Sequence, residues 1–563
     1  MSEAAPGPLK GRQVVKAVGA AVALRLLWLA YEKTLNVSWK SMTESQAYEA
    51  WLKFCKTINQ HALPEYLPKD AQGKRMSVPS ATPMVAATSL PHSVSEARIL
   101  APARLRGLTL RNRVIRAAAF DGENEQDCIQ THVDVAKGGV GMTTVAYCCV
   151  SSNGRSFDNQ LVMEASRSEF LHRLTNAVHE HGAAISAQLT HGGSFADRAA
   201  IGHEYQVAPS VVFNPAGFDF PRAMTLEDCN VMADNFAKAA GLAKECGFDC
   251  IELHAGHGYL LSQFLSPRMN LRNDCYGGTP EKRAAFPAEC LRRCRAAVGD
   301  DFPIIVKLNV HDGRWFGLEL ADATIAAHAL ADASADAIIV TCGSVAHNGF
   351  YMMRGNTPQA KLVQALPHAA KKLAMMVFGP VAVPDVPYED CFLRESARHI
   401  LAEVGNKTTV VLMGGVNSFS EMEGAMEEGF GFVQIARGLI REPDLVNRIE
   451  ASLRLRALVN NGSHPTPLED GEDDEISNPR SSCIRCNMCV IATVDPQASF
   501  GCPFQKMDAA RRTAAGKPAV FAVADYEREL AQDVIRTHAV RQDADLGDIE
   551  DLIAVSARHA GKV

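Results

Sequence analysis

Residues 226–258 contain the pattern that decides the fold: LEDCNVMADNFAKAAGLAKECG (226–247) is followed by CIELHAGHG (250–258). The first run is a helical stretch that ends in glycine, a residue that commonly caps a helix at its carboxyl end. The second run is short, apolar and close to continuous. Continuous apolar strands separated by helices are typical of a parallel sheet covered on both faces. This segment therefore predicts one helix–strand unit of an α/β fold.

The same alternation extends over residues 98–458. We expect eight strands, at 112–120, 140–150, 183–191, 250–258, 303–310, 337–344, 408–416 and 430–439, with helices such as 167–182, 226–247, 281–298 and 321–333 between them. Eight such units favour a closed (β/α)8 TIM barrel. A doubly wound sheet is the alternative, but no strand in the sequence opens into the GxGxxG turn of that fold.

Two extensions flank the predicted barrel. Residues 1–97 form a helical extension that ends in a Pro- and Ser-rich linker. Residues 459–563 begin with the acidic loop LEDGEDDEIS (468–477), contain a cluster of cysteines and end in a helical tail. We expect Val14–Tyr31, an apolar run interrupted by Lys16 and Arg25, to be a helix packed on the barrel. A targeting or membrane-surface segment is the alternative, because this region is cationic and poor in acids.

The composition excludes one class of partner and indicates a compartment. Apolar residues make up 47% of the chain and the formal net charge is −7, so no basic excess is available to bind nucleic acid. The partner we expect is a small-molecule substrate. Most of the 16 cysteines are scattered singly through apolar segments. Such scatter fits a reducing compartment, so we expect the cytoplasm, with an organelle or a membrane surface as the alternative.

The densest group of reactive side chains follows the fourth strand, in IELHAGHGYLLSQFL (251–265). Reactive groups of a barrel gather at the carboxyl ends of its strands. His254 and His257 can donate hydrogen bonds to a carbonyl or phenolate oxygen, and Tyr259 can donate a proton to a developing carbanion. Three such groups within six residues favour a catalytic site over a single structural histidine.

The longer run HAGHGYLLSQFLSPRMNLRNDCYGG (254–278) resembles the signature of the Old Yellow Enzyme family of FMN-dependent NADH:flavin oxidoreductases. Further segments resemble the family's landmarks in order: LAPARLRGLTLRNRVIRAAA (100–119), AQLTHGG (187–193), MGGV (413–416) and ARGLI (436–440). The resemblance implies a reductase in which NAD(P)H reduces FMN, and FMN then reduces an α,β-unsaturated carbonyl or a similar electrophilic acceptor.

The resemblance also implies roles for individual residues. His254 and His257 hold the substrate's carbonyl oxygen, and Tyr259 protonates the α-carbon after hydride from flavin N5 reaches the β-carbon. Gln188 bonds the pyrimidine edge of the flavin. Lys307 takes the place of a basic residue beside flavin N1, where a fixed cation stabilises the anionic reduced flavin.

A phosphate site is predicted on physical grounds as well. Barrels often bind phosphate with the loops after strands seven and eight. Gly414 and Gly415 let the backbone approach an anion closely, and Arg437 has a guanidinium suited to phosphate oxygens. Together these favour FMN. The resemblance adds Gly438 and Ala118 to the cofactor-binding residues.

Three features depart from the family or fall outside its signature. Phe120 stands where the family has a Thr or Cys near flavin O4, so we expect an altered flavin potential or a reshaped pocket. Arg354, beyond the sixth strand, is expected to bind substrate at the mouth of the barrel, with packing against its aromatic neighbours as the alternative.

The third feature is the cysteine cluster, whose members are Cys483, Cys486, Cys489 and Cys502. Larger members of the family carry a 4Fe-4S cluster here, with one more residue between the second and third ligands. Four thiolates can hold an Fe–S cluster or tetrahedral zinc. Reduced structural thiols remain a third interpretation.

Two alternatives to the ene-reductase function remain open. The chain can be an FMN dehydrogenase or demethylase that passes electrons to a cysteine-bound centre, which the cysteine cluster favours. It can also be a catalytically weak flavin-binding scaffold, which the Phe120 departure favours.

Overall fold

The computed structural model describes residues 90–119, 124–214, 219–313, 316–366, 385–460, 476–491 and 501–541, together with residues 372, 375, 376 and 383. The chain divides into two compact units, Met1–Leu63 and Pro64–Val563, and all described residues belong to the second. The predicted N-terminal helix and most of the linker, Phe120 and most of the acidic loop lie outside the described residues.

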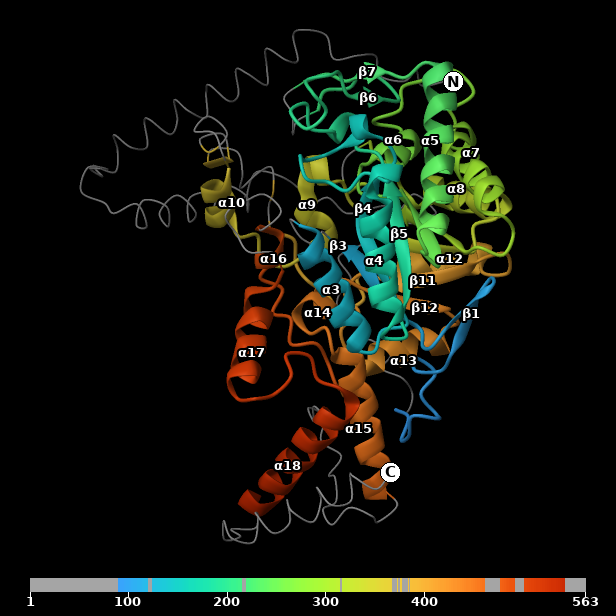
Figure 1. The fold of residues 1–563 in the computed structure, drawn as a ribbon. Coiled ribbons are helices and arrows are strands. Elements are labelled where there is room, and N and C mark those ends of the chain that lie inside the picture. Colours follow the sequence, from blue (N-terminus) through green and yellow to red (C-terminus); the bar gives the residue numbers. More distant parts are fainter. Residues whose placement is uncertain are drawn as a thin grey trace, which may run out of the picture. The chain divides into compact units, whose positions relative to one another are not determined.

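Eight parallel strands close into a barrel in chain order, which confirms the predicted (β/α)8 fold (Figure 1). The strands are β3 (Val114–Ala119), β4 (Met142–Cys149), β5 (Ala184–Thr190), β8 (Cys250–Ala255), β9 (Ile304–Asn309), β10 (Ala337–Thr341), β11 (Thr409–Met413) and β12 (Phe432–Ile435). Pairing of β12 with β3, in which Val433 lies opposite Val114, completes the ring. Each strand falls within its predicted range because continuous apolar runs are buried on both faces.

Helices cover the outside of the barrel (Figure 1). They are α3 (Glu125–Lys137), α4 (Ser168–His179), α5 (Leu226–Glu245), α7 (Pro280–Val298), α8 (Leu320–Asp332), α12 (Arg394–Val404) and α13 (Phe419–Glu427). Shorter helices lie in the segments that follow β8, β10 and β12, namely α6 (Leu260–Leu265), α9 (Val345–Met353), α10 (Gln359–Ala365) and α14 (Arg437–Arg441). Short 3₁₀ turns lie at Ser152–Gly154, Ala165–Arg167 and Gly193–Phe195. Helix α5 starts at a capping box formed by Thr225 and Asp228, and the chain turns into β8 at Gly247, whose φ of +87° suits glycine.

A hairpin closes the amino-terminal end of the barrel. Strands β1 (Ala103–Leu105) and β2 (Leu108–Leu110) pair antiparallel and bury Leu105 and Leu110 against residues at the starts of the barrel strands. Ile115, Cys250 and Phe432 belong to the same apolar cluster. Apolar side chains fill this end of the barrel, so we expect the reactive side chains at the opposite end, where the strands have their carboxyl ends. A second pair of short strands, β6 (Val207–Ala208) and β7 (Arg222–Ala223), lies in the loop after β5.

The C-terminal region packs beside the barrel through helices α15 (Leu445–Asn460), α16 (Met488–Ile491), α17 (Pro503–Ala514) and α18 (Val523–Arg541) (Figure 1). Asp444 is almost fully buried and joins these parts, because it pairs with Arg512 at 2.8 Å and accepts from the Phe521 backbone N–H at 2.8 Å. In the part of the chain that the structure describes, no helix is long and apolar enough to cross a membrane.

Candidate functional site

A cavity of about 640 Å³ opens at the carboxyl ends of the strands. Most of the residues predicted for the site line it, namely Ala118, Gln188, His254, His257, Tyr259, Gly414, Gly415, Arg437, Gly438, Cys483, Cys489 and Cys502. Lys307, Arg354 and Cys486 were also predicted but are not among the lining residues. A cavity of this size with a few polar groups is typical of a small-molecule site.

His254, His257 and Tyr259 come together as expected from their spacing. His254 lies near the end of β8, with its ring centroid 4.9 Å from that of His257 and 4.8 Å from that of Tyr259. His257 has a φ of +59°, which turns the chain back toward the cavity after the strand. Burial lowers the pKa of His254 well below its usual value, and the nearby His257 and Lys307 lower it further. Burial also lowers the pKa of His257 to about 3, so both rings are neutral at pH 7.

Neutral imidazoles offer N–H donors to a ligand oxygen without adding charge. The buried His254 Nδ1 has no hydrogen-bond partner among the described residues. His257 Nε2 lies 2.8 Å from the hydroxyl of Thr341 at the end of β10. A Cβ atom placed on Gly256 would lie only 2.8 Å from the methyl carbon of Thr341, so the two residues pack closely and position 256 requires glycine. When the hydroxyl donates to Nε2, the ring proton stays on Nδ1.

Tyr147, which the sequence analysis did not single out, is the partner of Tyr259. The two rings lie 5.2 Å apart, and their hydroxyls share a hydrogen bond. Burial raises the pKa of Tyr259 well above 10, and the neighbouring Tyr147 raises it further. Tyr259 is therefore a protonated phenol throughout the neutral range.

Lys307, predicted from the sequence as a fixed cation beside flavin N1, is paired with an acidic residue. Its Nζ lies 2.8 Å from Glu252 Oε1, and both side chains are 1% exposed. The two residues lie on the neighbouring strands β9 and β8. An unpaired charge in such a buried position is costly, so the glutamate compensates the lysine. The two side chains thus form a buried ion pair, and the role of Lys307 beside flavin N1 stays a prediction.

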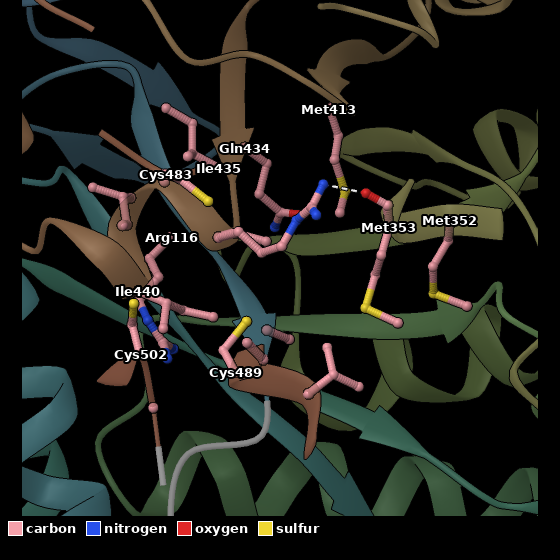
Figure 2. A pocket seen from close by; sticks show the side chains of 18 of the residues that line it. Arg116, Met352, Met353, Met413, Gln434, Ile435, Ile440, Cys483, Cys489 and Cys502 are labelled. Carbon is pink, nitrogen blue, oxygen red and sulfur yellow. Dashed lines mark hydrogen bonds between the residues drawn. The ribbon is translucent and has the colours of Figure 1, made fainter. Parts of the chain in front are cut away.

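Gly414, Gly415 and Arg437 form one side of the cavity. Both glycines have positive φ values, +94° and +88°. Arg437 donates to the carbonyl oxygens of Met353 and Arg354, and burial lowers its pKa. Figure 2 shows Met353 with this bond beside Met352 and Met413.

We expect Gly415→Ala and Gly241→Ala to change stability in opposite directions. A Cβ at Gly415 would lie 2.7 Å from Cys391 N and 2.8 Å from Glu389 O, in a left-handed conformation. Gly415→Ala should lower the free energy of unfolding by roughly 2 kcal/mol or more. Gly241 lies inside α5, and beyond its chain neighbours and the adjacent helix backbone no atom of the described residues comes within 4 Å of the point where its Cβ would stand. Gly241→Ala should therefore raise the free energy of unfolding by about 0.5–1 kcal/mol. Urea unfolding measures both, and equal destabilisation would contradict the expectation.

Arg354 is not among the residues that line the cavity, and its role in binding substrate stays a prediction. Its guanidinium stacks on the Phe392 ring at 4.1 Å and lies 3.9 Å from a Glu389 oxygen. The side chain thus packs against a ring that is distant in the sequence, and the Arg354 carbonyl oxygen accepts from Arg437.

Three of the four clustered cysteines, Cys483, Cys489 and Cys502, reach the cavity opposite the three methionines (Figure 2). Burial raises the pKa of Cys489 to about 12, and the positive charge of Arg437 opposes the shift. Among the described residues no group of three or more His, Cys, Asp or Glu side chains is arranged to hold a metal ion. Metal binding by the cysteines stays a prediction.

Asn487, between these cysteines in the chain, ties them to Arg437. Its side-chain oxygen accepts from Arg437 at 2.6 Å, and its amide donates to the carbonyl oxygens of Arg354 (3.1 Å) and Asn356 (2.9 Å). Asn487 is 1% exposed and has a φ of +56°, a conformation that asparagine tolerates better than most residues.

Comparison with known proteins identifies the family. The profile of the NADH:flavin oxidoreductase / NADH oxidase family matches residues 98–390, more than half of the chain. The chain belongs to this family. The resemblance inferred from the sequence is confirmed.

Among relatives of this NADH:flavin oxidoreductase, a 4,4'-dithiodibutanoate disulfide reductase from Rhodococcus erythropolis is 37% identical, over 70% of this chain and 92% of the relative. A metal reductase from Desulforamulus reducens is 30% identical, over 62% of this chain and 48% of its own length, so the chain spans only about half of that protein. An Old Yellow Enzyme homologue from Zymomonas mobilis has the same fold, with a TM-score of 0.50 at 22% identity, over 62% of this chain and 91% of the homologue.

The residues present fit the FMN and NAD(P)H that the family uses. His254 Nδ1 and Gln434 Oε1 are buried without partners among the described residues, so the cavity offers unused polar groups to a ligand. The glycines at 414 and 415 leave room for close approach, and Arg437 supplies a cation beside them. These residues would hold the phosphate, while Gln188 and Gln434 lie where a flavin's polar edge would need partners.

Thr341 provides a prediction about this NADH:flavin oxidoreductase. Thr341→Val removes the hydroxyl that bonds His257 and should weaken binding of a carbonyl ligand by about tenfold, the value of one lost hydrogen bond. Thr341→Ser keeps the hydroxyl and is the matched control, expected within about threefold of wild type. Titration of the flavin absorbance with the ligand measures both, and equal affinities in wild type and Thr341→Val would exclude the role.

Several residues that line the cavity were not predicted from the sequence. They are Arg116, Tyr147, Thr341, Tyr388, Gln434 and Arg485. Glu252, which is buried beside Lys307, could have been predicted as a functional residue, because it is an acidic residue in the largely apolar strand CIELHA. Nothing in the local sequence distinguishes Tyr147 or Thr341 from ordinary core positions.

Proposed function

We propose that the protein is an NAD(P)H-dependent reductase of electrophilic acceptors, with α,β-unsaturated carbonyl compounds as its main substrate class. The observation that carries this proposal is the arrangement of His254, His257 and Tyr259 around one cavity. Two neutral donors and a phenol that stays protonated suit a neutral carbonyl substrate better than an anionic one.

Each residue has a separate task in the proposed reaction. His254 and His257 bind the carbonyl oxygen and draw electron density from the conjugated double bond. FMN, when bound, carries a hydride from NAD(P)H to the acceptor. Tyr259 donates the proton that the α-carbon requires, and Tyr147 is placed to orient its hydroxyl. The net reaction converts NAD(P)H, a proton and the unsaturated carbonyl compound to NAD(P)⁺ and the saturated carbonyl compound.

The test is a two-step anaerobic experiment on the purified full-length protein. NADPH or NADH should bleach the flavin absorbance, and a later addition of an enone should restore it. A flavin that stays oxidised with both nicotinamides would support a scaffold and refute the proposal. A flavin that is reduced but not reoxidised by any enone would refute the substrate class alone.

A disulfide is the second candidate acceptor. The Rhodococcus erythropolis relative is a disulfide reductase, and this chain covers 92% of its length. Met352, Met353 and Met413 line the cavity, and thioethers are soft, polarizable contacts. In this reaction two electrons and two protons convert the disulfide to two thiols. Comparing kcat/KM for 4,4'-dithiodibutanoate and for an enone would decide between the two acceptors.

A third candidate function is an electron-transferring dehydrogenase, which would require a metal centre bound by the cysteine cluster. Metal analysis of the purified protein, combined with the visible spectrum after removal of FMN, separates this dehydrogenase from the two reductases. Iron with residual visible absorbance supports the dehydrogenase, whereas zinc or no metal argues against it.

A further inference from the structure

Four buried polar side chains form a network inside the barrel, below the cavity. Gln188 comes from β5, Glu252 from β8, Lys307 from β9 and Gln434 from β12. Each is at most 2% exposed. Gln188 and Glu252 lie opposite each other in the register of their strands, and Gln434 approaches from a strand that does not pair with β8.

Glu252 is the centre of this network. Its Oε1 accepts from Lys307 Nζ at 2.8 Å and from Gln188 Nε2, and its Oε2 accepts from Gln434 Nε2 at 2.9 Å. Three donors from three different strands thus meet on one carboxylate. A fully buried carboxylate is stable only when it is paired and hydrogen-bonded in this way.

The Glu252 carboxylate fixes the orientation of the side-chain amides of Gln188 and Gln434. An ionised carboxylate only accepts hydrogen bonds, so Gln188 and Gln434 must both present their NH₂ groups to Glu252. Their carbonyl oxygens then face other directions. Gln434 Oε1 has no partner among the described residues although it is buried, and both glutamines line the cavity.

The network also sets the charge beneath the cavity. Lys307 alone would place a positive charge close to any bound flavin, and Glu252 balances it at 2.8 Å. In a buried setting of low effective dielectric, removing either partner would change the local potential strongly.

We propose that Glu252 is a positioning residue for the cofactor. It balances Lys307, so that the ion pair sets the reduction potential of the bound flavin, and it holds the amide oxygens of Gln188 and Gln434 available as acceptors for the flavin's N–H group. The inference rests on the proposed function, because it requires FMN in this cavity.

A double-mutant cycle tests the pairing through the midpoint potential of bound FMN. Lys307→Gln, Glu252→Gln and the double variant are compared with wild type at pH 8. Lys307→Gln leaves an unbalanced carboxylate and should lower the potential by about 30 mV or more, a tenfold change in the two-electron equilibrium. Glu252→Gln should raise it by a similar amount. The double variant should return to within about twofold of wild type, about 10 mV.

The inference is overturned when Glu252→Gln matches wild type and the double variant matches Lys307→Gln, because Lys307 then acts alone. A matched control is Glu423→Gln on α13, another buried glutamate, which accepts from the Ile99 backbone N–H at 2.8 Å and should leave the potential unchanged. An FMN titration comes first. A wild-type protein that does not bind FMN contradicts the proposed function, whereas bound FMN whose potential Glu252→Gln leaves unchanged contradicts this inference only.

Discussion

Tyr259→Phe is expected to slow reduction of an α,β-unsaturated carbonyl by roughly 10²–10⁴-fold, the usual contribution of a positioned proton donor. Flavin reduction by NAD(P)H should stay within about twofold of wild type, because that half-reaction needs no proton from the phenol. Stopped-flow absorbance separates the two half-reactions. An equal loss in both would show that Tyr259 supports the site's structure and does not supply the proton.

Tyr147→Phe is the matched control for this variant. It removes the hydroxyl partner of Tyr259 and keeps the aromatic packing at 5.2 Å, so we expect the rate of enone reduction to fall by only about tenfold or less.

Because burial holds the pKa of Tyr259 above 10, the phenol does not lose its proton as the pH rises to about 9. The wild-type rate of enone reduction should therefore show no fall from Tyr259 ionisation in that range.

Arg437→Met is expected to weaken FMN binding by roughly 10²–10⁴-fold. A guanidinium that makes two charge-assisted hydrogen bonds to a phosphate contributes about 3–6 kcal/mol, and about 1.4 kcal/mol corresponds to tenfold. Fluorescence titration of the apoprotein measures the affinity. Riboflavin, which lacks the phosphate, should bind wild type and Arg437→Met alike. Were riboflavin affinity to fall as far as FMN affinity, Arg437 would be acting through the loops that it bonds.

Arg441→Met controls for loss of a cation from the same helix. Arg441 lies in α14 with Arg437, but pairs with Asp508 at 2.6 Å and is not among the residues that line the cavity. We expect its FMN affinity to remain within about threefold of wild type, since a partly exposed ion pair contributes little.

The barrel was predictable because its evidence is local in the sequence. Each strand is an apolar run bounded by helices, and burial on both faces is the physical cause of that run. The His254, His257 and Tyr259 group was predictable for a similar reason, since six residues at a strand end cannot separate far in space.

The missed features depend on register and on side-chain direction. The pairing of Lys307 with Glu252 joins two strands whose alignment the sequence does not state. Tyr147 lies within a register shift in β4 between Val145 and Cys148, and such an irregularity redirects side chains that simple alternation would place otherwise. The stacking of Arg354 on Phe392 could not be predicted because the two residues are distant in sequence yet close in space.

The bonds of Asn487 have a thermodynamic consequence for assembly. One amide links the cysteine segment, the turn at 354–356 and the guanidinium of Arg437, the residue proposed to hold the phosphate. By reciprocal linkage, whatever ligand immobilises that guanidinium also favours the folded form of the C-terminal segment, and an ordered segment tightens the ligand by the same free energy. We therefore expect loading of the cofactor and docking of the C-terminal segment to be coupled.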